Sequence, residues 1–276
     1  MKKFLVPTDF SETSKNAARY TAQMLNGKRG TQIILYYVYD GSTASPDGTL
    51  LSDEDDKDRE VILQQALHNI KLDLLELTDT DITTVTEKGD SLIENIERYV
   101  RHNGIDLVVM GITGATKLEQ IFMGSNTLRL VNEGVCPVMI IPPDAQYVEI
   151  KEVGLTSDFK NVDKTTPFAP IKALLDLFRP TLYIINVDSE HYVQITEEYK
   201  AQKNILDKHF EAYNPQYAFI RLYDFQDAID SFANDYEIDF IITVPRRHSF
   251  LGGLFKSSTT KKLAYHSRVP IVAIHE

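Results

Sequence analysis

The sequence motif that is most informative about chemistry in this chain consists of three glycines and a group of hydroxyl residues. Gly111 and Gly114, with two residues between them, come directly after the apolar run 107–110. Nine residues further on, a predicted helix opens with Gly124, Ser125, Asn126 and Thr127. A helix start presents free N–H groups and the positive end of the helix dipole, and glycines let the backbone approach a phosphate closely. The spacing therefore favours a phosphate-binding loop, while a plain strand-to-helix turn would also use glycines at these points.

Other kinds of catalytic or metal site find no support in the sequence. It has no Walker A loop, no Rossmann Gly-x-Gly-x-x-Gly and no Gly-x-Ser-x-Gly nucleophile turn. The seven histidines never stand at the spacing of metal ligands. The acidic run Asp53–Asp56 is typical of a solvated helix start, where carboxylates suit the dipole. We therefore predict no catalytic residue and no metal site.

Composition excludes several classes of protein. The chain has 276 residues, of which 43% are hydrophobic and 25% charged, as in ordinary globular proteins. Its net charge of −11 argues against nucleic acid or an anionic membrane surface as a partner. One cysteine excludes internal disulfides and fits a reducing compartment. The apolar runs are far shorter than the roughly 20 residues of a membrane span, and Met1–Pro7 predicts a strand rather than a signal peptide. We expect a cytoplasmic α/β protein.

Recurring stretches of sequence indicate an internal duplication. The recurring pairs are Val6–Phe10 with Leu155–Phe159, and Ile105–Val109 with Ile238–Ile242. The second pair is closer together along the chain than the first, as expected if the polar surface loop 40–56 were cut back in the second copy. The duplication places one domain at 1–143 and another at 148–276.

Each copy alternates short apolar runs with amphipathic stretches, which is the pattern of a parallel sheet covered by helices on both faces. The strands predicted in the first copy are Lys2–Pro7, Gln32–Val38, Ile82–Glu87, Asp106–Met110 and Val138–Ile141. Those predicted in the second are Lys151–Leu155, Leu182–Val187, Tyr217–Leu222, Asp239–Thr243 and Ile271–Ile274. Ser11 and Ser91 are predicted helix N-caps, and 55–77 is a predicted helix whose apolar face includes Val61 and Leu75. The sequence thus predicts two tandem doubly wound domains, each with a five-stranded parallel sheet.

The glycine spacing resembles the nucleotide-binding signature of the universal stress proteins, Gly-x2-Gly-x9-Gly-Ser. The matching positions are Gly111, Gly114, Gly124 and Ser125. Residues 6–11 (Val-Pro-Thr-Asp-Phe-Ser) resemble that family's first strand and turn, and 135–138 resemble its last strand. The resemblance extends over the chain as two copies. It implies a tandem member of the family, with strand order 3-2-1-4-5 and an adenine nucleotide between strands 1 and 4.

The resemblance also implies roles for individual residues in binding ATP, ADP or AMP, with or without Mg²⁺. Asp9 would hydrogen-bond the ribose, beside a wall formed by Pro7 and Thr8. Val38 would meet the adenine through its backbone, and Met110 would lie under the base or sugar. The phosphates would be lined by Gly111, Gly114, Gly124, Ser125, Asn126 and Thr127. Asp9 also has a local interpretation, as a cap for the helix that follows it.

The second copy departs from this signature. When the copies are aligned on Pro137 and Pro270, the three glycines become Val244, Arg247 and Ser257. A valine and an arginine would crowd the path of a triphosphate, so the second domain is not expected to bind ATP in the family's manner. The basic cluster there would either hold another anion or form a solvated or partner-facing turn. Its members are Arg246, Arg247 and His248.

Three functions remain open at this point. The first is an ATP-binding stress-response or regulatory protein, with the nucleotide in the first domain and a structural or partner-binding second domain. The second is a slow ATP hydrolase or phosphotransferase, for which the sequence offers no clear general base. The third is a nucleotide-free interaction scaffold. The resemblance further implies pairing through the fifth strand of each sheet, which gives an internal pseudo-dimer and allows a homodimer. An exposed edge strand is expected to be covered in any case.

Overall fold

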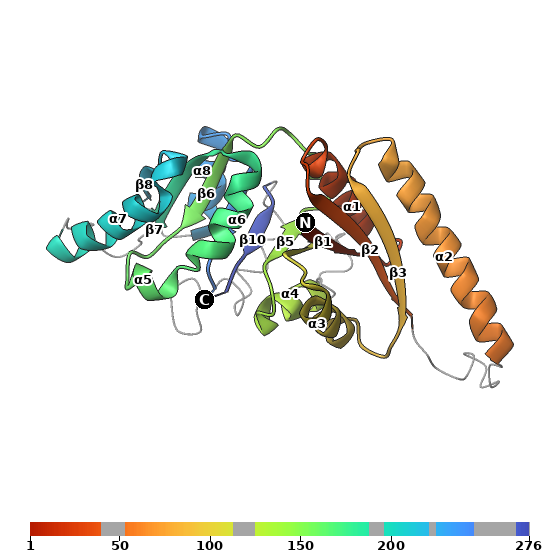
Figure 1. The fold of residues 1–276 in the computed structure, drawn as a ribbon. Coiled ribbons are helices and arrows are strands. Elements are labelled where there is room, and N and C mark those ends of the chain that lie inside the picture. Colours follow the sequence, from red (N-terminus) through yellow and green to blue (C-terminus); the bar gives the residue numbers. More distant parts are fainter. Residues whose placement is uncertain (40–52, 113–124, 188–195, 221–224, 246–268, 276) are drawn as a thin grey trace. The chain divides into compact units, whose positions relative to one another are not determined.

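The computed structural model describes residues 1–39, 53–112, 125–187, 196–220, 225–245 and 269–275 (Figure 1). Among these residues, the chain divides into two compact units. The first unit contains the first four strands and the first four helices, and the second contains Ile112 and the chain from Pro137 onward, with the remaining strands and helices. The domain bounds predicted from the duplication, 1–143 and 148–276, stay a prediction.

The first unit is a parallel sheet with helices on both faces. Its strands are β1 (Lys2–Pro7), β2 (Thr31–Tyr39), β3 (Asp81–Lys88) and β4 (Leu107–Gly111), in the order β3-β2-β1-β4. Its helices are α1 (Glu12–Leu25), α2 (Asp53–Leu75), α3 (Leu92–Asn103) and α4 (Ser125–Glu133). Helix α1 packs beside α2, and α3 packs beside α4 (Figure 1). This is the doubly wound arrangement that the alternating sequence pattern predicted.

Local sequence signals fix the ends of two of these helices. The Ser11 hydroxyl accepts a hydrogen bond from the Ser14 N–H at the start of α1, and the Ser91 hydroxyl accepts one from the Glu94 N–H at the start of α3. Helix α3 ends at Gly104, whose φ of 61° lies in the left-handed region that favours glycine. Both predicted N-caps are thus confirmed.

Helix α2 buries a narrower face than its sequence pattern suggested. Leu67 and Leu74 are almost fully buried against the unit. Val61 and Leu75, which we expected on the same face, are 64% and 45% exposed. The expectation was wrong for these two residues because α2 carries apolar side chains on more than one side, and the sheet covers only one of them.

The second unit repeats the same plan with a full set of five strands. Its strands are β6 (Glu152–Thr156), β7 (Thr181–Val187), β8 (Gln216–Ile220), β9 (Phe240–Thr243) and β10 (Ile271–Ala273). They follow the order β8-β7-β6-β9-β10, which corresponds to 3-2-1-4-5 and confirms the predicted fold class. Its helices are α5 (Val162–Thr165), α6 (Phe168–Phe178), α7 (Glu197–Phe210) and α8 (Phe225–Asp235), with a short 3₁₀ helix at Glu211–Tyr213. The helix after β6 is therefore broken before Phe168, whereas α1 is continuous.

Strand β5 (Val138–Ile141) also belongs to this unit and covers the edge of its sheet. It pairs antiparallel with β10, with Ile140 opposite Ile271 and Val138 opposite Ala273. Both strands are fully buried along their length. The outer edge of β10 is thus satisfied by the strand that closes the first copy of the repeat.

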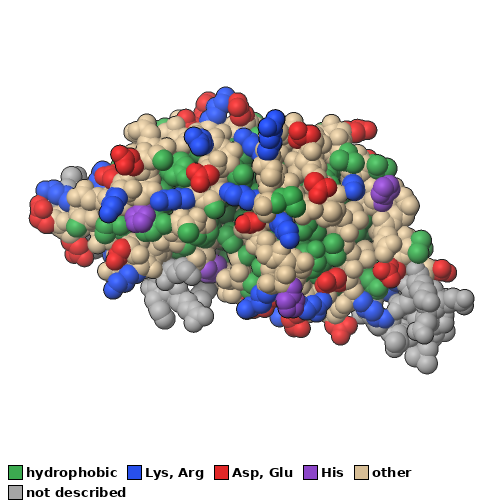
Figure 2. Space-filling model, viewed as in Figure 1, with side chains coloured by type: hydrophobic (Ala, Val, Ile, Leu, Met, Phe, Trp, Pro, Cys, Tyr) green, Lys and Arg blue, Asp and Glu red, His purple; other side chains and the backbone are tan. Residues whose placement is uncertain are grey.

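The surface offers two further observations. In the described part of the chain, no helix is both long enough and apolar enough to cross a membrane. On the face shown in Figure 2, acidic and basic side chains are interspersed over most of the visible surface.

Candidate functional site

The carboxyl ends of three neighbouring strands bring several of the predicted site residues to one edge of the first sheet. Strand β1 lies between β2 and β4, with Pro7 opposite Tyr36 and Leu5 opposite Val108. The same register carries Met110 and Val38 to this edge, where Met110 is buried and Val38 half-buried. In open α/β sheets ligands bind at such strand ends, between neighbouring strands whose connections diverge.

The turn from β1 into α1 is held by its own side chains. Phe10 has a φ of 64°, and its N–H donates to the Thr8 hydroxyl at 3.0 Å. The Asp9 carboxylate accepts a bond of 3.0 Å from the N–H of Ser11 and one of 2.5 Å from its hydroxyl. Partial burial disfavours the charged form of Asp9, but the hydrogen bonds from Ser11 outweigh it and lower the pKa of the carboxyl below its ordinary value. The turn therefore presents a stably ionised carboxylate at the strand ends.

Thr8 anchors this turn in the core. It is only 6% exposed, its N–H donates to the Tyr36 carbonyl oxygen at 2.9 Å, and its hydroxyl shares a 2.9 Å hydrogen bond with the Ser14 hydroxyl. The ring of Phe10 lies 4.8 Å from the ring of Tyr37. Asp9, by contrast, is exposed, so the turn has a rigid base and an accessible acidic tip.

Gly111 lies where the end of β4 passes directly under the first turn of α1. A Cβ atom at this position would stand 2.4 Å from the carbonyl oxygen of Thr13 and 2.8 Å from its carbonyl carbon. Real Cβ atoms do not approach backbone atoms so closely, so any larger residue would force the strand and the helix apart. The glycine is thus required by a helix that packs closely on the strand.

The first turn of α4 is tied to the same point. The Thr127 hydroxyl donates to the Gly111 carbonyl oxygen at 3.2 Å, and Thr127 is 2% exposed. Asn126 is exposed, and the first turn of α4 carries no acidic residue. The N-terminus of α4 therefore opens beside the end of β4 with its dipole uncompensated by a carboxylate in that turn.

Several predicted residues lie outside what the structure describes. Gly114 and Gly124 are among them, and for Ser125 only the backbone, as the first residue of α4, is described. The basic cluster of the second copy, Arg246, Arg247 and His248, is also outside the described residues. Among the described residues, no group of three or more His, Cys, Asp or Glu side chains is placed to hold a metal ion.

The second unit repeats the turn of the first. Phe159 has a φ of 53°, its N–H donates to the Ser157 hydroxyl at 3.2 Å, and the Asp158 carboxylate accepts a 3.0 Å bond from the N–H of Lys160. These are the bonds made around Phe10, apart from the one from the Ser11 hydroxyl, which Lys160 cannot make. The turn is therefore preserved in a copy that has lost the glycine signature.

Beside this second turn, the described residues line a small cavity. Val244 stands where the first copy has Gly111, and with Asp158, Thr165 and Leu206 it lines a cavity of about 10 Å³. Such a cavity has room for about one water molecule. Val244 has a full side chain beside α5, whereas α1 leaves no room for a Cβ atom at Gly111 in the first copy.

Sequence analysis missed the two partners that set this geometry. Thr13 and Ser14 follow the capping Ser11, and nothing in their spacing signals that one backs Gly111 and the other supports Thr8. The only available hint is the density of hydroxyl residues after Asp9, which is typical of a turn with several side-chain hydrogen bonds.

The fold and the strand-end site define the chain as a doubly wound α/β protein. Its strand-to-helix turn occurs twice, and in the first unit Gly111 contacts the first turns of α1 and α4. Comparison with known proteins gives the family. The profile of the universal stress protein family matches residues 1–142, which is more than half of the chain, and the chain belongs to that family.

Relatives support this assignment. The universal stress protein MJ0531 of Methanocaldococcus jannaschii is 30% identical over 145 residues, which cover 51% of this chain and 81% of that protein. MJ0577 of the same organism is 25% identical over 152 residues, which cover 51% of this chain and 94% of that protein. The crystal structure of a universal stress protein from Archaeoglobus fulgidus has a TM-score of 0.67 at 19% identity and covers 99% of this chain and 96% of its own. That last likeness extends the fold to both halves.

Proposed function

We propose that the first half of the chain binds an adenine nucleotide, with ATP as the leading candidate, and that the protein acts as a nucleotide-dependent stress-response or regulatory protein. One observation carries the proposal. Gly111, at the carboxyl end of β4, accepts a hydrogen bond from the first turn of α4 and backs onto the first turn of α1 without room for a Cβ atom.

The phosphates would bind at the N-terminus of α4 rather than at that of α1. The first turn of α1 carries Glu12, and its cap is already occupied by the Ser11 hydroxyl. The first turn of α4 has no acidic residue and follows the glycine-rich segment of the sequence. Since the Thr127 hydroxyl donates to Gly111, Thr127 would hold the helix start in place while backbone N–H groups meet the phosphates.

The sugar and base would lie along the ends of β1 and β2. Asp9 is exposed there as an ionised acceptor for ribose hydroxyls, and the Ser11 hydrogen bonds lower the pKa of its carboxyl further below the ordinary value. Pro7 and Thr8 form the buried wall behind it, and Val38 offers backbone groups at the end of β2. Mg²⁺, if bound, would be held chiefly by the phosphates, as is usual for this ion.

The second half would serve as support or as a partner surface. Val244, in place of Gly111, argues against a nucleotide held there in the family's manner. The antiparallel β5–β10 pairing supports the view that the fifth strands of the two repeats join in an internal pseudo-dimer.

Calorimetry with ATP, ADP and AMP tests this proposal, and the chain provides a matched pair of variants. Asp9→Asn and Asp158→Asn alter the same turn in the two halves, so they share the structural effect of weakening its backbone hydrogen bond, and Asp9→Asn also alters the bond from the Ser11 hydroxyl. We expect one site per chain, an affinity for ATP about tenfold lower in Asp9→Asn, where a charged hydrogen bond is weakened, and no change in Asp158→Asn.

Two results would overturn the proposal. The first is the absence of heat with all three nucleotides, together with no nucleotide in the purified protein, which would favour the scaffold alternative. The second is an equal loss in both aspartate variants, which would reduce Asp9 to a turn residue. Steady release of ADP in the presence of Mg²⁺ would move the function to the hydrolase alternative.

A further inference from the structure

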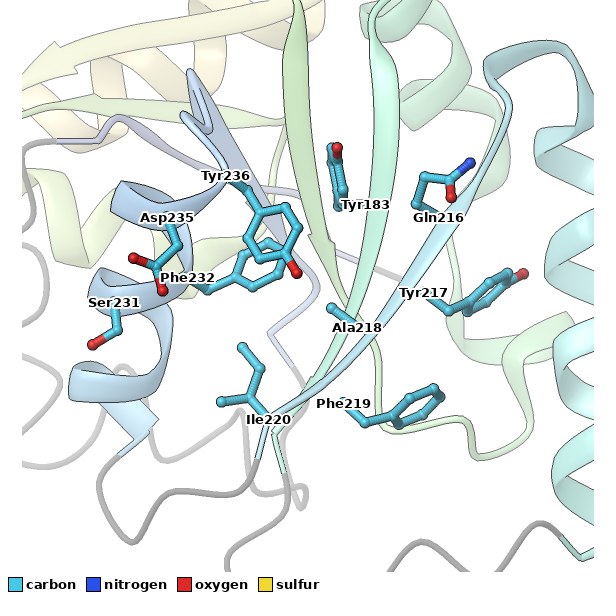
Figure 3. Close-up of a pocket in the computed structure, with 10 residues that line it drawn as sticks. All are labelled: Tyr183, Gln216, Tyr217, Ala218, Phe219, Ile220, Ser231, Phe232, Asp235 and Tyr236. Atoms are coloured by element: carbon cyan, nitrogen blue, oxygen red, sulfur yellow. The ribbon is translucent and has the colours of Figure 1, made fainter.

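A separate cleft lies in the second unit, between the edge strand β8 and helix α8 (Figure 3). Its volume is about 590 Å³, and its walls come from β7, β8 and α8. This volume falls within the range of about 300–1,000 Å³ that is usual for small-molecule sites. The cleft is remote in sequence from the glycine signature and plays no part in the nucleotide proposal.

One wall of the cleft is aromatic. The rings of Phe232 and Tyr236 are stacked at 4.3 Å with an interplanar angle of 21°. Tyr183, from β7, lies 5.4 Å from the ring of Tyr236 and 5.9 Å from that of Phe232, and the three rings gather on one side in Figure 3. Tyr236 is 49% exposed, so one part of its ring remains open after stacking on Phe232. The open face of an aromatic ring is negative and attracts cations.

The charged groups around the cleft are also negative. Among the ten described residues that line the cleft, Asp235 has the only formal charge. Helix α8 ends at Asp235, so the negative end of its dipole also lies here. Behind Tyr183, on the next strand, Glu152 has a buried carboxylate oxygen that makes no hydrogen bond within the described residues. Burial, with the nearby Glu152, raises the pKa of Tyr183 above its ordinary value and keeps its hydroxyl neutral. The cleft therefore combines open ring surface with negative charge.

We propose that this cleft binds an organic cation, an alkyl guanidinium or alkylammonium group, with the cation over the exposed ring of Tyr236 and within reach of the Asp235 carboxylate. The alkyl chain of the ligand would lie against Phe232 and the β8 residues Ala218 and Ile220, which pack against the apolar cluster under α8. An anion such as a nucleotide phosphate is disfavoured here because the described lining offers no basic side chain.

Two sources could supply such a cation. One is a free small molecule, and the other is an arginine or lysine side chain of an extended peptide. The second source has its own structural support, because β8 is the last strand in the sheet order and its outer edge has no neighbour among the described strands. A peptide strand could pair there while its basic side chain entered the cleft.

Calorimetry at low salt distinguishes the sources. Agmatine, which has a guanidinium and an ammonium group on a four-carbon chain, is the small-molecule probe, and uncharged 1,4-butanediol is its control. An acetylated and amidated hexapeptide with one central arginine in an alternating Thr/Val sequence is the peptide probe. We expect agmatine or the peptide to bind and the diol not to bind. Tighter binding of the peptide than of agmatine assigns the cleft to a peptide partner.

Variants tie the binding to the named groups. Tyr236→Leu is expected to weaken binding about tenfold, from the loss of the ring face, while Tyr236→Phe keeps the ring and stays close to the wild type. Asp235→Asn is expected to weaken binding about threefold and to reduce its salt dependence. Asp73→Asn is the matched control, since Asp73 is an exposed carboxylate on α2 of the first unit.

The proposal fails if neither probe binds at millimolar concentration, if the diol binds as well as agmatine, or if Tyr236→Leu binds like the wild type. Titration of Tyr236→Leu with ATP keeps this test apart from the nucleotide proposal. Loss of agmatine or peptide binding with unchanged ATP binding supports a separate cation site, and loss of both would indicate a general defect in folding and would refute the assignment to this cleft.

Discussion

Replacing Gly111 with alanine tests the close packing of α1 on β4. The new Cβ atom would stand 2.4 Å from the Thr13 carbonyl oxygen, whereas an unstrained contact needs about 3.5 Å. The helix or the strand must therefore move by roughly 1 Å. Helix α1 cannot move freely, because Ala17 and Leu25 are fully buried against the rest of the unit. Overpacking of this kind costs about 2–3 kcal/mol when rigid backbone, rather than a side-chain tip, is in the way.

Hydrogen exchange, measured by mass spectrometry on peptides from α1 and β4, reports the local stability of the first unit alone. A loss of about 2–3 kcal/mol corresponds to exchange that is about 30- to 160-fold faster in these peptides when opening limits exchange. Gly154→Ala is the matched control on strand β6. Its Cβ atom would meet the flexible tip of Ile185 at 2.9 Å, so we expect a cost below about 1 kcal/mol in the second unit.

The reasoning is refuted if Gly111→Ala exchanges no faster than the wild type, or if its local loss is smaller than the loss that Gly154→Ala causes around β6. Either result would mean that the end of β4 and the first turn of α1 are not packed as tightly as the structure has them. Gly111 would then be explained by its place in the glycine signature alone.

Three further predictions concern single side chains of the first unit. Tyr36→Phe removes the 2.6 Å hydrogen bond from the buried Tyr36 hydroxyl to Glu87. This variant should lower the free energy of unfolding, measured by urea titration, by about 1–2 kcal/mol. An unchanged midpoint and slope of the urea titration would contradict this prediction. The lowered pKa of Asp9 means that its charged form stabilises the fold above the unfolded value near 4 and that this contribution is lost as pH falls through the folded value. The stability difference between wild type and Asp9→Asn should therefore shrink between about pH 5 and pH 3, and a constant difference would count against the Ser11 hydrogen bonds. Burial raises the pKa of the Cys136 thiol to about 12, so alkylation by iodoacetamide at pH 8.5 should be roughly a thousandfold slower in the folded protein than in urea; similar rates would show that the thiol is accessible and ionised.

The fold could be predicted to a large extent because its signals are local. Strands Lys2–Pro7 and Val138–Ile141 have the predicted bounds, since each contains an apolar run that a proline ends or directly follows. The N-caps Ser11 and Ser91 are likewise encoded by a residue and its near neighbours. Because the sequence repeats, one predicted strand order applied to the sheets of both copies.

The features that sequence could not supply depend on contacts between distant segments. The exposure of Val61 depends on which side of α2 the sheet covers, and periodicity alone does not choose between two apolar sides. The reason for Gly111 is the Thr13 carbonyl, which is far away in the sequence. The break before Phe168 follows Thr166-Pro167, a helix boundary that the similarity of the two copies obscured.

Because the strand-to-helix turn occurs twice in this chain, its two copies can be compared directly to separate the effects of folding and of a ligand. Asp9 and Asp158 occupy the same turn, yet only the first copy retains the glycines beside it. After duplication, the demands of folding continued to act on both turns, while any demand from a ligand could lapse in one of them. The turn by itself therefore accounts for the aspartate in both copies of this chain, and ribose binding by Asp9 would be an additional role. Selection for a ligand would instead be recorded at positions that diverged between the copies and have no such role in the turn, such as Gly114 and Arg247.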